Sequence, residues 1–167
     1  MYELWEENRK DMIFMIKIVN EDIMNAKEYI IAHQVNCFTM GSGLAKTIFT
    51  KYPKVKTEHA KIVQQYKGNE KALLGTAQLV HVGDHVIANC FGQYNYGRDK
   101  TVVYTDYNAL RISFMCVRAR MSVDPTLTLA IPYNIGCGLA NGDWNKVIKI
   151  IKNVFEKYDN RVKIYKL

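Results

Sequence analysis

Short apolar segments alternate along this chain with longer segments in which apolar residues recur every three or four positions. Residues 12–19, 29–32 and 127–131 are apolar runs too short for helices and typical of buried strands. The strongest helical periodicity is carried by Trp144, Val147, Ile148, Ile151, Val154, Phe155 and Tyr158. Because a helix buries its apolar stripe against a second layer, this alternation predicts an α/β fold.

Helical periodicity also covers three further segments, at residues 44–52, 57–66 and 107–121. Pro53 ends the first of them, since proline cannot continue the hydrogen-bonding pattern of a helix. Thr105 or Asp106 is available as the N-cap of the third.

The remaining strands are indicated by turn chemistry and by alternation. Residues 76–82 and 85–89 flank Gly83-Asp84, and glycine at the first position of a two-residue turn predicts a type II′ antiparallel hairpin. Residues 161–165 alternate as an edge-like strand. About six strands and about four helices together predict a three-layer α/β/α sandwich around a mixed sheet.

Length and composition are those of one ordinary domain covering residues 1–167. The chain is 49% hydrophobic and 23% charged, with no repeat, linker or compositional break. No apolar stretch reaches the roughly 18 residues of a membrane helix, so no membrane partner is expected. Residues 12–19 contain Lys17 and follow a mixed acidic and basic leader, unlike a signal peptide, so a cytoplasmic location is expected.

The cysteines and histidines show no metal-binding spacing. Cys37, Cys90, Cys116 and Cys137 contain no C-x-x-C pair, which favours reduced thiols over a zinc site or a disulfide framework. His81, Asp84 and His85 gather at the predicted hairpin tip, where a solvated turn is the expected interpretation. Neither a metal nor another cofactor is expected, while the net charge of +7 allows an anionic partner.

Two glycine-rich loops each follow a predicted strand and precede a predicted helix. The first is residues 33–43 (H-Q-V-N-C-F-T-M-G-S-G), and the second is residues 132–143 (P-Y-N-I-G-C-G-L-A-N-G-D). Backbone N–H groups in such loops can approach an anion, and the helix dipole favours it, so the pair predicts a site for a pyrophosphate. Neither loop has the G-x-x-x-x-G-K-[ST] or the G-x-G-x-x-G spacing, which argues against P-loop phosphoryl transfer and hydride transfer.

These motifs resemble those of macrodomains, the ADP-ribose-binding α/β/α modules, and the resemblance covers residues 12–167. It is carried by V-N-E-D-I at residues 19–23, by H-x-x-N-C followed by G-S-G-L-A, and by I-G-C-G-L-A in the second loop. The run P-Y-N-I-G-C-G-L-A-N-G-D-W at residues 132–144 is most similar to the branch of terminal ADP-ribose protein glycohydrolase and the ADP-ribose 1″-phosphate phosphatases.

The resemblance implies a role for each matched position. Asp22 would accept a hydrogen bond from the adenine amino group, with Ile23 packed nearby, and Asn36 would face the distal ribose. One phosphate would meet the backbone N–H groups of Gly41, Ser42, Gly43 and Leu44. The other phosphate and the distal ribose would be enclosed by Ile135, Gly136, Cys137, Gly138 and Leu139. ADP-ribose or a derivative is therefore the expected ligand.

The catalytic residues of the glycohydrolase branch are not matched. Its aspartate after G-C-G-L is replaced by Ala140, and residues 102–107 (V-V-Y-T-D-Y) stand where its lysine is expected, although Lys100 is close. The remaining pattern resembles the phosphatases, with His33 three residues before Asn36 and Asp143 beyond the second loop. Our hypothesis is a hydrolase acting on ADP-ribose 1″-phosphate or on an ADP-ribosyl linkage, in which these residues position water and stabilise charge.

Structural roles and other functions compete with this hypothesis. Asp143 and Asp22 stand where helix caps are expected, and His33 ends an apolar strand as structural histidines do. Residues 91–100 could form a flap over the distal ribose with Tyr94, Tyr96 and Arg98 as contacts. The alternative functions are a non-catalytic reader of ADP-ribose, including ADP-ribosylated macromolecules, and a basic nucleic-acid-binding domain.

Overall fold

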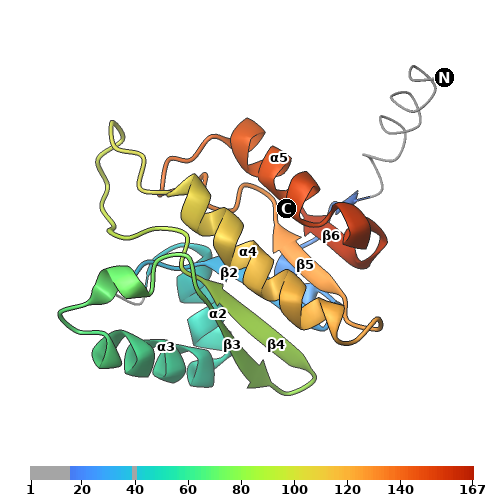
Figure 1. Cartoon of the computed structure of the whole chain (residues 1–167), viewed down its shortest axis with the longest axis horizontal. Coiled ribbons are helices and arrows are strands. Elements are labelled where there is room, and N and C mark those ends of the chain that lie inside the picture. The colour runs from blue at the N-terminus through green and yellow to red at the C-terminus, as the bar shows by residue number, and fades with distance from the viewer. Residues whose placement is uncertain (1–15, 39–40) are drawn as a thin grey trace.

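The computed structural model describes residues 16–38 and 41–167 and contains one six-stranded sheet flanked by helices (Figure 1). The strands are β1 (Lys17–Val19), β2 (Ile30–Gln34), β3 (Ala77–Val82), β4 (His85–Cys90), β5 (Leu129–Pro132) and β6 (Val162–Tyr165). The α-helices are α2 (Leu44–Lys51), α3 (Pro53–Gln65), α4 (Tyr107–Ser122) and α5 (Trp144–Val154). Short 3-10 helices are η1 (Ile23–Asn25), η2 (Glu70–Ala72) and η3 (Glu156–Arg161).

The sheet is mixed, with strand order β1-β6-β5-β2-β4-β3. All neighbouring strands are parallel except β3 and β4, which form the predicted antiparallel hairpin. Gly83 has a φ of 55° while Asp84 is not left-handed, as a type II′ turn requires. The hairpin prediction is confirmed.

Helices cover both faces of the sheet, α4 and α5 on one side and α2 and α3 on the other (Figure 1). In β2, Ile30 and Ala32 belong to the core beneath α4 and α5, whereas Ile31 belongs to the core beneath α2 and α3. This alternation follows from the two-residue period of a strand, and burial on both faces explains why β2 reads as a continuous apolar run. The three-layer sandwich predicted from the sequence is therefore confirmed.

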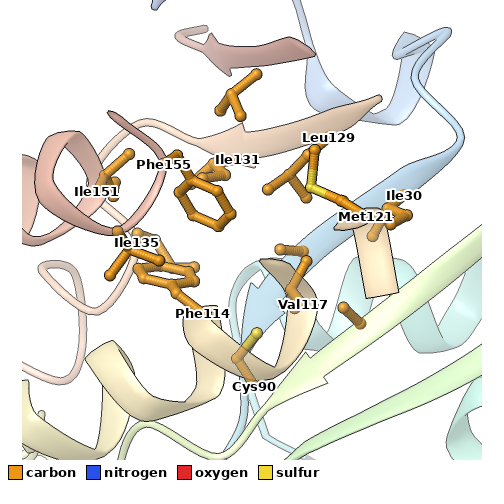
Figure 2. Packing of buried hydrophobic residues seen from close by; sticks show 14 of the residues in the cluster. Ile30, Cys90, Phe114, Val117, Met121, Leu129, Ile131, Ile135, Ile151 and Phe155 are labelled. Carbon is orange, nitrogen blue, oxygen red and sulfur yellow. The ribbon is translucent and has the colours of Figure 1, made fainter. Parts of the chain in front are cut away.

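The larger core lies between the sheet and the helix pair α4 and α5. Figure 2 shows Phe114 and Phe155 with Ile131 and Ile151 around them, and the two phenylalanine rings lie 5.8 Å apart in an edge-to-face arrangement. Aromatic pairs prefer this geometry because the edge of one ring is attracted to the face of the other. The packing fixes α4 and α5, and with them the loops that precede both helices.

One strand prediction is wrong in its placement. Residues 161–165 were expected as an edge strand, but β6 lies between β1 and β5, and Val162 and Ile164 are buried. The alternation of apolar and polar residues that suggested an edge strand is due to Lys163, whose side chain is exposed and forms an ion pair with Glu28, with Nζ 3.2 Å from Oε1. The edge is β1, at the end of the predicted run 12–19, of which residues 12–15 lie outside the described part of the chain.

The topology brings three loops together. Because β5, β2 and β4 are adjacent and parallel, their carboxyl ends at Pro132, Gln34 and Cys90 lie at one edge of the sheet. After β2 the chain continues into α2, and after β4 it continues into α4, and these two helices lie on opposite faces of the sheet. Ligands bind at such a divergence in open α/β sheets.

Among the described residues, no helix is long and apolar enough to span a bilayer.

Candidate functional site

A cleft opens where these three loops meet. One cavity of about 390 Å³ is lined by Gln34, Val35, Asn36, Gly41, Ser42, Ala45, Gln93, Tyr96, Gly97, Arg98, Leu139 and Ala140. A second of about 350 Å³ is lined by His33, Gln34, residues 42–45, Gln93, residues 132–136 and residues 138–140. Since Gln34, Ser42, Ala45, Gln93, Leu139 and Ala140 belong to both, the two cavities form one continuous cleft between the glycine loops.

The first glycine loop (residues 33–43, described except for 39 and 40) gives α2 an uncapped start. Gly41 and Gly43 have φ values of 60° and 58°, a backbone region that favours glycine. A Cβ on Gly41 would lie 2.9 Å from that of Ala45, so a side chain there would collide with α2. Gly43 occupies the N-cap position and supplies no side-chain oxygen. Within residues 16–38 and 41–167, no side-chain cap is therefore found at the start of α2, which suits an anion at this end of the helix.

The second glycine loop (residues 132–143) is folded on itself by backbone hydrogen bonds. Cys137 N–H donates to Asn134 O at 2.8 Å, and Gly142 N–H donates to Gly136 O at 2.9 Å. Asn134, Gly136 and Asn141 all adopt left-handed φ values, of 62°, 71° and 59°. Asparagine tolerates this region better than most residues, so the two asparagines serve the turns as glycine does.

Gln34 is the polar link between the walls of the cleft, and the sequence alone did not single it out. Its Nε2 donates to Gln93 Oε1 at 2.9 Å and to Thr105 Oγ1 at 3.0 Å. Thr105 in turn donates to Gly136 O at 2.5 Å. Both partners of Nε2 are acceptors, because Gln93 Nε2 donates elsewhere and the Thr105 proton is engaged. The side chain thus ties β2 to the segment after β4 and to the second glycine loop.

The segment after β4, residues 93–105, overlaps the predicted flap (residues 91–100) and is braced against the second glycine loop; it is called the flap below. Tyr104 N–H donates to Ala140 O at 2.9 Å, and Asn141 Nδ2 donates to the carbonyls of Asp99 and Val102 at 3.0 and 2.7 Å. Gly97 packs against the Tyr104 phenol so closely that a Cβ would collide with it. Tyr96 and Arg98, two of the three flap residues named from the sequence, line the cleft. Tyr94 does not line it and instead packs on Phe38.

Asn36 lies in the cleft wall, and its expected role beside a distal ribose remains a prediction. It is 4% exposed, and its Oδ1 accepts a hydrogen bond from Phe38 N–H at 2.9 Å. Its backbone oxygen accepts from His59 Nε2 of α3 at 3.3 Å. His59 is buried, and burial lowers its pKa against the raising effect of that hydrogen bond. Because a backbone carbonyl can only accept, His59 carries a proton on Nε2 and donates it to the Asn36 oxygen.

His33 is buried in β2, with 1% of its surface exposed, although it contributes to the wall of the second cavity. Its Nε2 lies 2.5 Å from Asn89 Oδ1, and Asn89 Nδ2 donates onward to Gln78 Oε1 at 3.0 Å. Because an amide oxygen can only accept, His33 carries its proton on Nε2, and its buried Nδ1 has no partner in the described chain. Burial lowers the pKa of His33 to about 4. The ring is neutral at pH 7.

Asp22 and Asp143 both cap helices. Asp22 Oδ1 accepts from Met24 N–H at 2.9 Å at the start of η1, and Asp143 Oδ1 accepts from Asn145 N–H at 2.9 Å at the start of α5. Neither residue lines the two cavities, and neither does Ile23, which is buried. Their expected roles toward adenine and in catalysis remain predictions.

The four cysteines are free thiols. Burial raises the pKa of Cys37 and Cys90 to about 12 and that of Cys137 to about 11, so these three are protonated at neutral pH. Among the residues that the structure describes, no three His, Cys, Asp or Glu side chains gather as a metal site would require.

Charge in the cleft is one-sided. Among the described residues that line the two cavities, Arg98 is the one with a positively charged side chain, because His33 is neutral. None of these lining residues is an aspartate or a glutamate. Backbone N–H groups of the two glycine loops add partial positive charge. The cleft therefore favours an elongated anion.

Comparisons with known proteins place this fold among macrodomains. No family model and no curated protein matches the chain. A protein of unknown function from Bacteroides thetaiotaomicron is similar in structure, with a TM-score of 0.76 and 26% identity over 91% of this chain and 98% of that one. The macrodomain of Mycobacterium tuberculosis DarG gives a TM-score of 0.72 and 19% identity, covering 90% and 96%. Thermosipho africanus DarTG, solved in complex with ADP-ribose, gives 0.69 and 17%, covering 90% of this chain and 41% of that one. The architecture is the macrodomain fold.

Proposed function

We propose that this chain binds ADP-ribose in the cleft between its two glycine loops. The observation that carries the proposal is the single continuous cleft that both loops line, with an uncapped helix start on one side and a left-handed glycine turn on the other. Each cavity has the size of a small-molecule site. Solved macrodomain-fold complexes with ADP-ribose, from Thermosipho africanus and Oceanobacillus iheyensis, support this ligand.

In this proposal the diphosphate lies across the cleft. The amides of Gly43 and Leu44 meet one phosphate, and those of residues 135–139 meet the other. Asn36 stands beside the distal ribose, at the cavity that the flap also lines. Asp22 and Ile23 take the adenine, outside both cavities, through a carboxylate that already caps η1 with one oxygen.

Retention of the ligand is better supported than its hydrolysis. Of the three residues expected to act in catalysis, His33 is buried and donates to Asn89, while the Asp143 carboxylate caps α5. Asn36 lines the cleft but neither donates nor accepts a proton as a general acid or base does. A reader of ADP-ribose or of ADP-ribosylated macromolecules is consequently the first candidate. Hydrolysis of ADP-ribose 1″-phosphate or of an ADP-ribosyl linkage is the second.

The test is calorimetric titration with ADP-ribose beside AMP, followed by a phosphate-release assay on ADP-ribose 1″-phosphate with the same sample. We expect ADP-ribose to bind at least tenfold more tightly than AMP, because AMP reaches only one loop. Gly41→Val should abolish binding, since its side chain collides with α2. Gly68→Ala, after the end of α3, has open space around its Cβ but a left-handed φ of 85°, so it controls for backbone strain away from the cleft and should leave binding unchanged. Equal affinity for both ligands would refute the two-loop site. Phosphate release that is lost in a His33→Ala, Asp143→Ala double variant would establish the hydrolase instead.

The nucleic-acid alternative makes a different prediction. Affinity for a polynucleotide that falls steeply with salt, without preference for free ADP-ribose, would replace the proposal by a basic nucleic-acid-binding domain.

A further inference from the structure

The second glycine loop contains the one Asn-Gly dipeptide of the chain, Asn141-Gly142. In such a dipeptide the backbone nitrogen of the glycine can attack the side-chain carbonyl carbon of the asparagine. Glycine favours this attack because it has no side chain in the way and its backbone reaches conformations that other residues rarely adopt. Asn134, the other left-handed asparagine of the loop, is followed by the β-branched Ile135, which hinders the same attack. Asn141 is therefore the asparagine of this loop that is chemically predisposed to lose its amide.

The same side chain joins the second glycine loop to the flap. Asn141 Nδ2 donates to Asp99 O at 3.0 Å and to Val102 O at 2.7 Å. Both partners are backbone carbonyls, which only accept, so the contact requires a group with two N–H donors. An aspartate at this position would place a carboxylate, which has no proton to donate at neutral pH, against the two carbonyl oxygens. Two hydrogen bonds would be replaced by repulsion between oxygens.

The closed flap holds both reacting groups away from this reaction. Gly142 N–H donates to Gly136 O at 2.9 Å, and the nitrogen must give up this proton to attack. The Asn141 amide is held by the two flap carbonyls. Since these contacts lie near the surface, separating the flap from the loop costs less free energy than global unfolding. The reaction should therefore proceed in the native protein, but more slowly than in an unfolded chain.

We propose that Asn141 is a site of spontaneous deamidation and that its conversion releases the flap from the second glycine loop. The Gly142 nitrogen forms a bond to Asn141 Cγ and gives up its proton, while the Cγ–Nδ2 bond breaks and the amide nitrogen leaves with that proton as ammonia. Water then opens the resulting succinimide ring at either of its carbonyl carbons, which yields aspartate or isoaspartate. Nothing is oxidised or reduced, and water is the co-reactant.

Release of the flap alters the cleft, because Tyr96, Gly97 and Arg98 line it. Isoaspartate also lengthens the backbone of a loop that is tightly packed, since a Cβ on Gly142 would collide with the carbonyl of Gly136. Refolding does not reverse the change, so each copy of the protein would lose its closed cleft once and permanently. This inference goes beyond the proposed function and does not depend on which ligand the cleft holds.

The chemical step is tested by incubating the full chain at mildly alkaline pH, with and without urea. Peptide mapping by mass spectrometry measures the conversion of Asn141 and that of Asn134, the matched control. We expect Asn141 to convert in the native protein at least tenfold more slowly than in urea, and Asn134 to remain largely unconverted. The proposal would be overturned by native conversion of Asn134 as fast as that of Asn141, or by equal Asn141 rates with and without urea. A native Asn141 still intact when the urea sample has fully converted would also overturn it.

The effect on the flap is tested by hydrogen exchange of the Tyr104 amide, which donates to Ala140 O at 2.9 Å and so reports contact between flap and loop. Asn141→Asp reproduces the product. Asn134→Asp makes the same change of charge at the same kind of backbone conformation, without a flap contact in the described chain. We expect exchange at least tenfold faster than wild type in Asn141→Asp and within threefold of wild type in Asn134→Asp. Unchanged exchange in Asn141→Asp, or equal acceleration in both variants, would refute the release of the flap.

Discussion

Adding one methyl group at Gly136 should destabilise the protein strongly, although this position lies in a loop. Gly136 has a φ of 71°, and alanine in this region costs about 1 kcal/mol. The new Cβ would lie 2.8 Å from Gln34 Oε1 and 2.9 Å from Thr105 Oγ1. Neither atom can withdraw without breaking hydrogen bonds that join the two residues to each other and to the Gly136 carbonyl.

The expected magnitude follows from these terms. Two hydrogen bonds are worth roughly 1 kcal/mol each, so Gly136→Ala should lower the free energy of unfolding by about 2–4 kcal/mol together with the backbone term. For a chain of this length the melting temperature should fall by roughly 5–15 °C. ADP-ribose affinity should fall as well, because the second glycine loop would shift.

Gly138→Ala is the matched control, two residues away in the same loop. A Cβ there meets no atom within 4 Å, and its φ is outside the left-handed region. We expect its free energy of unfolding to stay within about 0.5 kcal/mol of the wild type. Urea denaturation and thermal melting of both variants provide the comparison. If Gly136→Ala were no less stable than Gly138→Ala, the Gln34 link would not hold the loop as the hydrogen bonds indicate.

Three further predictions concern the buried histidines and the α5 cap. The folded chain holds His33 at a pKa of about 4 against 6.5 for the free side chain, so the unfolded chain binds a proton that the folded chain does not. The contribution of His33 to the free energy of unfolding should therefore be fully present above pH 6.5 and be lost, by up to about 3 kcal/mol, as the pH falls toward 4. Urea denaturation at several pH values measures this change, and the free energy of unfolding of His33→Gln should depend less steeply on pH. His59 holds the Asn36 backbone, and in our proposal only the distal ribose depends on Asn36, so His59→Ala should weaken ADP-ribose binding several-fold but leave ADP binding nearly unchanged. His59→Gln should restore part of the lost affinity. Equal losses of affinity for ADP-ribose and ADP would contradict this reasoning. Asp143→Ala should lower stability by about 1 kcal/mol without changing ADP-ribose affinity, and Asp143→Asn, which keeps a capping oxygen, should remain near wild type by the same melting assay.

The elements that the sequence predicts well are those determined by neighbouring residues. Gly83 defines the hairpin, Asp106 and Asp143 cap the helices they precede, and periodicity marks residues 144–154. Helical periodicity alone could not show that α5 ends at Val154, because the apolar residues at 155 and 158 continue the same pattern through η3.

Contacts between distant residues were not predictable in this way. The placement of β6 depends on β1, and no local pattern distinguishes an edge strand that alternates from an interior strand whose lysine reaches Glu28. Gln34 is an ordinary polar residue at the end of an apolar run, and its partners are 59 and 71 positions away. His59 lies on a helix 23 residues after the carbonyl that it holds. The glycine loops could be found from their composition, but the side chains that brace them could not.

The position of β6 has a consequence for how the protein is made. Among the strands that the structure describes, β1 pairs with β6 alone, so residues 17–19 leave the ribosome long before their partner, residues 162–165, has been synthesised. Strands β2, β3 and β4 can pair with one another earlier, because the residues that they pair lie within 60 positions of each other. The sheet should consequently assemble from the hairpin side outward, with its opposite edge closing after translation of β6. A nascent chain stalled before residue 162 should resist proteolysis at the hairpin while its first strand is still cut.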